Sequence, residues 1–300
     1  MSAALNWDRE GRIWPHREAS RFVDVGAARW HVQRMGAGGT AAKPQMLLLH
    51  GTGASVHSWR GIMPLLEENF DVLAPDLPRQ GFTRGHPPDA MSLPRMATAI
   101  ADLLDAEKFD PAILVGHSAG AAIGLQMALD HGFDGPIVGL NSALRPFPGP
   151  AAQIFPAVAK LLFVNPLVPR LFSGMASLTG DTRRFLQRAT NSRIDEEGLA
   201  CYTALLQNSR HTEGALAMMA NWDLPGLRAR MGEIENSVLL VHSDNDAAIP
   251  LDWAREADGW LPDSRLEVLE GLGHLAHEED PREVARRIEH FAKEHLAKAR

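Results

Sequence analysis

Short apolar runs alternate with longer helical segments along most of the chain, and this alternation predicts the fold. The runs are apolar at consecutive positions, which is typical of strands covered on both faces of a parallel sheet. The segments between them, such as 93–107 and 119–129, have the character of helices. We therefore expect an α/β protein with a mostly parallel central sheet and helices on both faces. The expected strands are 46–50, 70–74, 111–115, 136–140, 237–242 and 265–269, preceded by a hairpin at 21–25 and 29–34.

One long stretch interrupts this rhythm. Between the strands expected at 136–140 and 237–242 there are many prolines and helix-like segments at 182–190 and 196–208, but no convincing strand. We interpret this stretch as a helical insertion, or cap, between two strands of the sheet. The last helix has a clear start, because Asp280 caps it and Pro281 takes its first position. The predicted organisation is an N-terminal extension over 1–20, core over 21–141, the helical cap over 142–224 and core again over 225–300.

Composition narrows the function classes. Hydrophobic residues at 45% and charged residues at 22% are ordinary globular values, which excludes a disordered or fibrous chain. A net charge of −7 argues against a nucleic-acid partner. Cys201 is the only cysteine, so an internal disulfide and a cysteine-based zinc site are both excluded. The polar N-terminus does not match a secretory signal, and no apolar run reaches about 18 residues. We expect a cytoplasmic protein.

The sharpest local motif is Gly116-His117-Ser118-Ala119-Gly120. It fits Gly-x-Ser-x-Gly, in which a serine lies on a tight turn between a strand and a helix. The flanking glycines are needed because the neighbouring strand and helix leave no room for side chains. The motif alone is weak, but here a buried strand precedes it and a helix follows it. Ser118 is therefore a candidate nucleophile.

A serine nucleophile needs a base and an acid that orients the base. In this architecture they follow the serine in the order acid, then histidine, each just after a strand. Asp246 follows the strand at 237–242 and is the preferred acid, with Asp244 as the alternative. His274 follows the strand at 265–269 and is the preferred base, with His277 as the weaker candidate.

An oxyanion-binding loop is the fourth expected element. The segment His50-Gly51-Thr52-Gly53-Ala54-Ser55 ends the first central strand and is rich in glycine. We expect the backbone N–H groups of Thr52 and Ala119 to point at the oxyanion that develops during acyl transfer. Each such donor is typically worth about 3 to 4 kcal/mol in the transition state.

With these motifs, residues 21–298 resemble the α/β hydrolases that carry a helical cap. The turn Asp76-Leu77-Pro78-Arg79-Gln80-Gly81-Phe82-Thr83 is similar to the Asp-x-Pro-Gly-His-Gly-x-Ser turn of that family. Arg79 and Gln80 stand where glycine and histidine are usual. The resemblance implies a hydrolase that uses the Ser118, Asp246 and His274 triad without a metal or organic cofactor.

A narrower resemblance lies in the segments 6–22, 30–36 and 50–55. They are similar to the magnesium-chelatase accessory proteins, an α/β-hydrolase-like group found among the bacteriochlorophyll biosynthesis genes of purple phototrophs. This resemblance implies a role near magnesium insertion into protoporphyrin, with magnesium chelatase subunits as partners. The ATPase motor of a chelatase is excluded, because the chain has no Gly-x-x-x-x-Gly-Lys-[Ser/Thr] motif.

Two functional hypotheses follow. The first is a serine hydrolase that acts on an ester-like bond of an apolar or tetrapyrrole-related substrate. The alternative is a non-catalytic tetrapyrrole-binding or chelatase-assisting protein on a hydrolase scaffold, and C–C bond hydrolysis by the same triad also stays open. The apolar segment 154–175 either packs on the core as a lid or roofs a large apolar substrate, with peripheral contact to a membrane surface.

Overall fold

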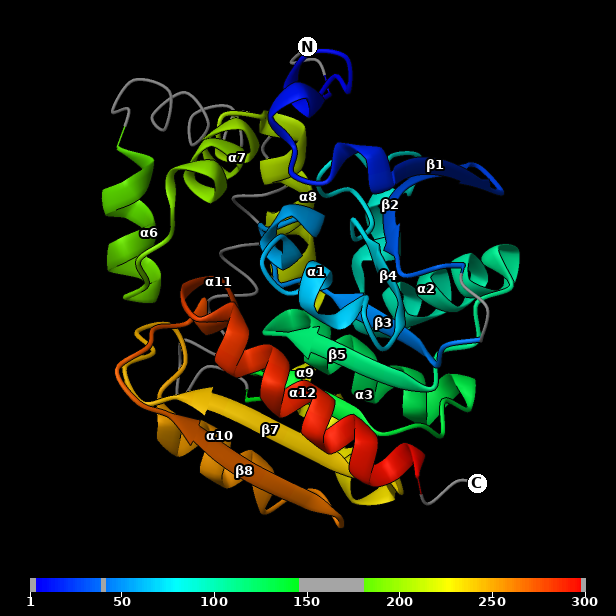
Figure 1. Cartoon of the computed structure of the whole chain (residues 1–300), viewed down its shortest axis with the longest axis vertical. Coiled ribbons are helices and arrows are strands. Elements are labelled where there is room, and N and C mark those ends of the chain that lie inside the picture. Colours follow the sequence, from blue (N-terminus) through cyan, green and yellow to red (C-terminus); the bar gives the residue numbers. More distant parts are fainter. Residues whose placement is uncertain (1–3, 39–41, 146–180, 298–300) are drawn as a thin grey trace.

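The central sheet runs through the whole molecule and carries helices on both faces (Figure 1). The computed structural model describes residues 4–38, 42–145 and 181–297. Within them, eight strands form one sheet in the order β1-β2-β4-β3-β5-β6-β7-β8. β2 pairs antiparallel with both β1 and β4, and every other neighbouring pair is parallel. The strands are β1 (Ser20–Val25), β2 (Ala28–Met35), β3 (Gln45–Leu49), β4 (Asp71–Pro75), β5 (Ile113–His117), β6 (Ile137–Leu140), β7 (Val238–Ser243) and β8 (Ser264–Leu269).

The predicted fold class is confirmed by this sheet. Every expected strand occurs, and each begins and ends within two residues of the expected bounds. The apolar runs were a reliable signal because the central strands are buried on both faces, as in β3, where Leu47 and Leu48 are fully buried in opposite layers of the core.

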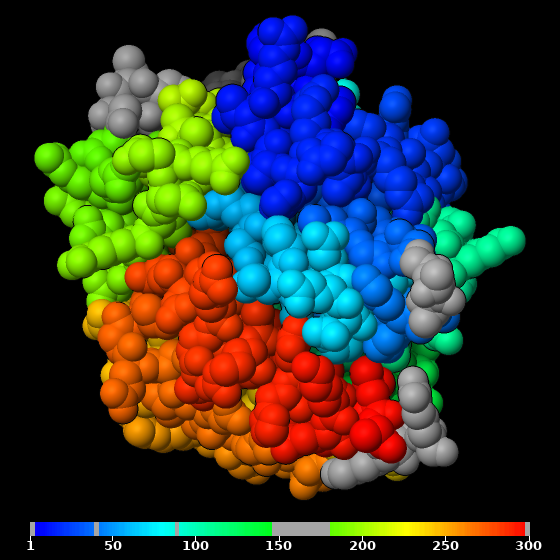
Figure 2. All heavy atoms as spheres, viewed as in Figure 1, coloured from blue at the N-terminus to red at the C-terminus, as the bar shows by residue number. Residues whose placement is uncertain are grey.

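Two groups of helices cover the sheet. On one face lie α1 (Met63–Leu66), α11 (Ala276–Glu279) and α12 (Pro281–Leu296), which Figure 2 shows packed side by side. Behind the sheet in Figure 1 lie α2 (Leu93–Glu107), α3 (Ala119–His131), α9 (Leu224–Arg230) and α10 (Leu251–Asp258). The expected start of α12 is confirmed, because Asp280 accepts a hydrogen bond from the backbone N–H of Glu283 at 3.1 Å.

Between β6 and β7, the described stretch of residues 181–237 contains helices and no strand. Its helices are α6 (Thr182–Thr190), α7 (Glu196–Leu206), α8 (Ser209–Asn221) and α9. The helix expected at 196–208 ends earlier, at Leu206. Asn208 starts a new helix there, because its side chain accepts hydrogen bonds from the N–H groups of Arg210 and His211, both at 3.1 Å. The apolar segment 154–175 lies outside the described residues, and the division into core and cap stays a prediction.

The N-terminal segment packs against both the sheet and α7 (Figure 2). Trp7 lies against His31 of β2 with ring centroids 4.8 Å apart, and Trp14 is buried on Phe82. The carbonyl of Ile13 accepts a weak hydrogen bond from the thiol of Cys201 in α7 at 3.7 Å. This segment therefore joins the edge of the sheet to the helices above it.

Candidate active site

Ser118 lies at the sharp turn between β5 and α3 with φ 51° and ψ −110°. A positive φ is strained for a residue with a Cβ, so the surrounding structure must hold it. The N–H of Ser118 donates to the carbonyl of Leu140 at 2.8 Å, and its own carbonyl accepts from the N–H of Ala143 at 3.1 Å. These bonds to the end of β6 fix the turn at the carboxyl edge of the sheet.

The two glycines of the motif allow the close packing around this turn. A Cβ on Gly116 would lie 2.3 Å from the backbone nitrogen of Ala121. A Cβ on Gly120 would lie 2.0 Å from the carbonyl oxygen of Leu49, at the end of β3. Both distances are too short for real atoms, so glycine is required for α3 to pack against β5 and β3.

Asp246 and His274 form a buried pair at the ends of β7 and β8. The Nδ1–H of His274 donates to Oδ2 of Asp246 at 2.7 Å. The other carboxylate oxygen accepts from the N–H groups of Ala248 at 2.7 Å and Ile249 at 2.8 Å. Burial alone would raise the pKa of Asp246, but the hydrogen bond and charge of His274 and the other donors outweigh it. The pKa of Asp246 therefore lies below its usual range, and the carboxylate stays charged.

The alternative residues have other contacts. Asp244 is exposed, and its Oδ1 accepts from the N–H of Gly271 at 2.7 Å, which ties the two loops together. His277 is buried in α11 with its ring centroid 4.3 Å from that of His117. Burial lowers the pKa of His277 well below its ordinary value. The structure thus brings Asp246, and not Asp244, to His274.

His274 lies next to the turn that carries Ser118. The Nε2–H of His117 donates to the carbonyl oxygen of His274 at 3.0 Å, and the two rings are 4.8 Å apart. Figure 1 shows the ends of β5, β7 and β8 at one edge of the sheet. Since Nδ1 of His274 carries the proton, Nε2 is the basic nitrogen. Among the described residues, none hydrogen-bonds this nitrogen or the hydroxyl of Ser118.

The loop after β3 packs directly on this turn. A Cβ on Gly51 would lie 3.1 Å from the Cβ of Ser118, so the loop approaches closely because the residue is glycine. The N–H of Gly53 is taken by the side-chain oxygen of Gln80 at 2.7 Å. The N–H of Thr52 has no acceptor in the described part of the chain. The N–H of Ala119 is one of the unpaired donors at the start of α3.

Three side chains outside the predicted site contact this loop, those of Gln80, His211 and Met218. Gln80 stands where the family usually has histidine, and its Nε2–H group contacts the sulfur of Met218 in α8 at 3.2 Å. His211, also in α8, accepts from the N–H of Gly81 at 3.0 Å and donates from Nε2 to the carbonyl of Gly53 at 3.1 Å. Arg79 adopts a φ of 61° at the position where glycine is usual in this turn.

Asn141 is a further residue missing from the predicted site. Its Nδ2–H group donates to Oδ2 of Asp246 at 2.8 Å, so this carboxylate oxygen is shared with His274. A signal for Asn141 was present in the sequence, because it is the first polar residue after the strand expected at 136–140.

The end of α6 supports the loop that carries His274. The carbonyl of Thr190 accepts from the N–H of His274 at 2.8 Å, and the hydroxyl of Ser192 accepts from the N–H of Leu275 at 2.8 Å. A Cβ on Gly273 would lie 2.5 Å from that hydroxyl. Glycine at this position therefore lets the histidine loop and the end of α6 meet.

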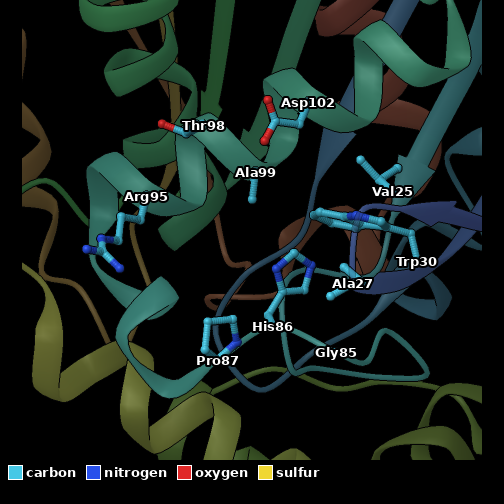
Figure 3. A pocket seen from close by; sticks show the side chains of 11 residues that line it. Val25, Ala27, Trp30, Gly85, His86, Pro87, Arg95, Thr98, Ala99 and Asp102 are labelled. Carbon is cyan, nitrogen blue, oxygen red and sulfur yellow. The ribbon is translucent and has the colours of Figure 1, made fainter.

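Two cavities lie outside the candidate triad, and the second borders the loop after β3 through His211. One, of about 270 Å³, is shown in Figure 3 between Trp30, His86 and α2. The other, of about 300 Å³, is lined by three arginines and lies beside α8. Neither is lined by Ser118, Asp246 or His274. The described residues contain no group of three or more side chains that could hold a metal ion, and no described helix is long and apolar enough to cross a membrane.

The sheet order and the strand-to-helix turn at Ser118 define an α/β-hydrolase fold. The model of the alpha/beta hydrolase family matches residues 46–287, and the chain belongs to this family. This confirms the resemblance seen in the sequence.

The narrower resemblance is also confirmed by a named relative. The chain is 39% identical over 269 residues to the 30 kDa subunit of magnesium chelatase from Rhodobacter capsulatus, covering 88% of this chain and 91% of that protein. It is 27% identical to the pimeloyl-[acyl-carrier protein] methyl ester esterase of Aromatoleum aromaticum, over 79% of this chain and 95% of that enzyme. The enol-lactonase structure from Burkholderia xenovorans shares the fold, with a TM-score of 0.74, 19% identity and coverage of 91% of this chain and 100% of that one.

Buried neutral histidines should make the protein acid-sensitive. Burial, followed by the charge of His274, lowers the pKa of His117 to about 3. In the unfolded chain the pKa of a histidine is about 6.5. Between these values the unfolded state binds the extra proton, so stability falls as pH falls, by about 1.4 kcal/mol per pH unit for each such residue. We expect the free energy of unfolding, measured in urea, to fall steeply from pH 6.5 to pH 4.

The substitution His117→Gln should lower the number of protons taken up on unfolding by about one. The slope of the free energy of unfolding against pH should therefore become shallower, whatever the effect on absolute stability. An unchanged slope in His117→Gln would contradict the buried neutral state of His117.

Proposed function

We propose that the protein is a serine hydrolase that cleaves an ester-like bond through an acyl-serine. Ser118 is the nucleophile, His274 the base and Asp246 the acid that orients the base. The observation that carries this proposal is the buried Asp246–His274 pair, 2.7 Å between Oδ2 and Nδ1, held next to the strained turn of Ser118. In other hydrolases a serine, a histidine and an aspartate in these roles perform acyl transfer.

The proposed reaction has two balanced steps. The Oγ of Ser118 attacks the carbonyl carbon of the substrate while its proton passes to Nε2 of His274. This proton then goes to the oxygen of the leaving alcohol as the ester bond breaks, which leaves an acyl-serine. A water molecule, deprotonated by the same nitrogen, attacks the acyl-serine, and the acid product leaves as Ser118 regains its proton. The charged carboxylate of Asp246 stabilises the imidazolium in both steps.

The negative charge on the carbonyl oxygen would be stabilised by the N–H groups of Thr52 and Ala119. Both groups are free of other acceptors in the described structure. The contacts of Gln80 and His211 with Gly53 support the loop, so these donors are held before the substrate arrives. Such preorganised donors stabilise the transition state without reorganisation during the reaction.

We propose an apolar or tetrapyrrole-related ester as the substrate class. Support comes from the apolar segment 154–175 of the sequence and from the relative named as a magnesium-chelatase subunit. The same relative supports magnesium chelatase subunits as partners and a role in bacteriochlorophyll biosynthesis. A cytoplasmic location with peripheral membrane contact through the helical insertion belongs to the same proposal.

Replacing the nucleophile tests the chemistry. Ser118→Ala should lower the turnover of a short-chain aryl ester by a factor on the order of 10⁶ and abolish labelling by a fluorophosphonate, because the attacking oxygen is lost. The melting temperature should not fall, since the strained turn keeps its backbone bonds. Wild-type protein that neither cleaves the ester nor takes the label would refute the proposed reaction.

A second comparison separates the two candidate acids. Asp246→Asn should cost about 10⁴ in rate, because the amide no longer holds His274 in the required tautomer. Asp244→Asn is a closely matched control, since its amide oxygen can still accept the bond from Gly271. A larger loss in the Asp244 variant would overturn the assignment of Asp246.

A non-catalytic accessory role is the second candidate, and the relative named as a chelatase subunit favours it. The two roles differ in their dependence on one oxygen atom. If the protein is a hydrolase in its pathway, a strain with Ser118→Ala should accumulate the same pigment precursor as a strain that lacks the gene. Normal pigment in the Ser118→Ala strain would move the protein to the accessory role, because the substitution leaves the surface almost unchanged.

A further inference from the structure

Arginine side chains gather around the cavity of about 300 Å³ beside α8. Arg79 and Arg84 come from the segment after β4, and Arg210 comes from the first turn of α8. The N-terminal residues Ala4 and Leu5 complete another part of the wall. Three arginines thus line one cavity, and among the described lining residues Glu213 alone carries a carboxylate.

Most of this positive charge is not compensated. Arg79 forms an ion pair with Glu213 at 2.6 Å and donates to the carbonyl of His86 at 3.2 Å. Arg84 donates to the carbonyl of Leu5, which carries no net charge. Within the described residues, neither Arg84 nor Arg210 has a carboxylate at ion-pair distance. An excess of about two positive charges therefore remains around the cavity.

The surroundings make this charge unfavourable in the empty protein. Burial lowers the pKa of Arg84, and the charges of Arg29 and Arg210 lower it further. Arg210 also lies at the positive end of α8, where a cation is disfavoured by the helix dipole. Like charges held together in this way repel each other, and a bound anion would relieve the repulsion.

The histidines in the wall add polarity but no charge near neutral pH. Burial lowers the pKa of His86 and of His211 to about 4 in each case. His211 uses both ring nitrogens in bonds to Gly81 and Gly53. Nε2 of His86 is buried and has no hydrogen-bond partner in the described structure. A ligand in this cavity therefore meets guanidinium groups as its only cations.

We propose that this cavity binds a small organic molecule or ion through an oxyanion group, a carboxylate or a phosphate, held by Arg84 and Arg210. The planar fork of a guanidinium matches both groups and forms charge-assisted hydrogen bonds with them. The volume suits a small ligand. The site is separate from the candidate active site, because none of its lining residues belongs to the proposed triad.

The two sites share a wall. Gly81 and His211 line the cavity, and the opposite ring nitrogen of His211 holds the carbonyl of Gly53 in the loop after β3. An anion bound to Arg210 would thus restrain the start of α8 next to His211, which supports the loop after β3.

Calorimetric titration at constant ionic strength tests the proposal, with sodium phosphate in one arm and sodium succinate in the other. We expect saturable binding of at least one, and the arm that saturates identifies the oxyanion as phosphate or carboxylate. Arg210→Gln should weaken this binding about tenfold or more, because one charge-assisted contact is lost. Arg210 is the variant of choice because it is exposed and holds no other element.

Arg282→Gln, an exposed arginine of α12, is the matched control and should leave the binding unchanged. Arg84→Gln provides a second variant, with its fold checked by circular dichroism because of the bond to Leu5. No saturable binding of either anion to the wild-type protein would overturn the proposal. Equal binding by the wild type and Arg210→Gln would overturn it as well, because Arg210 would then not hold the anion.

Discussion

The rest of the structure depends on the strained backbone of Ser118, with its positive φ between β5 and α3. This conformation can persist only if the neighbouring elements over-determine it. The residues at and just after the end of β6 hydrogen-bond both the N–H and the carbonyl of Ser118. The end of β3 packs so closely against Gly120 that a Cβ would not fit there. The parallel order β3-β5-β6 in the middle of the sheet is therefore also the support of the candidate nucleophile.

The helices α6 and α8 contribute contacts to the candidate site. α8 holds the loop after β3 through His211 and Met218, and the end of α6 holds the backbone of His274 and Leu275. Any movement of these helices would thus shift both the candidate oxyanion donors and the candidate base.

Burial sets the charges of the site. His117 and His211 are kept neutral by desolvation, so they serve as hydrogen-bond donors with a defined tautomer. Asp246 is buried too, yet it keeps its charge because several donors converge on its carboxylate. One fixed negative charge beside an imidazole is the electrostatic arrangement that the proposed acyl transfer requires. The family and the named relatives agree with a hydrolase scaffold. Whether the cell uses this scaffold for catalysis depends on the role of Ser118.

Much of this could be predicted from the sequence alone. The strands were found because residues buried on both faces of a sheet must be apolar at consecutive positions, which is a local pattern. The positions of Asp246 and His274 followed from the order of the strands, because the carboxyl ends of parallel strands meet at one edge. The contacts of Gln80, His211 and Met218 could not be predicted. They join residues far apart in the chain, such as Gln80 and Met218, separated by 138 positions. No local pattern specifies which helix face meets which loop, so only the packed tertiary structure decided them.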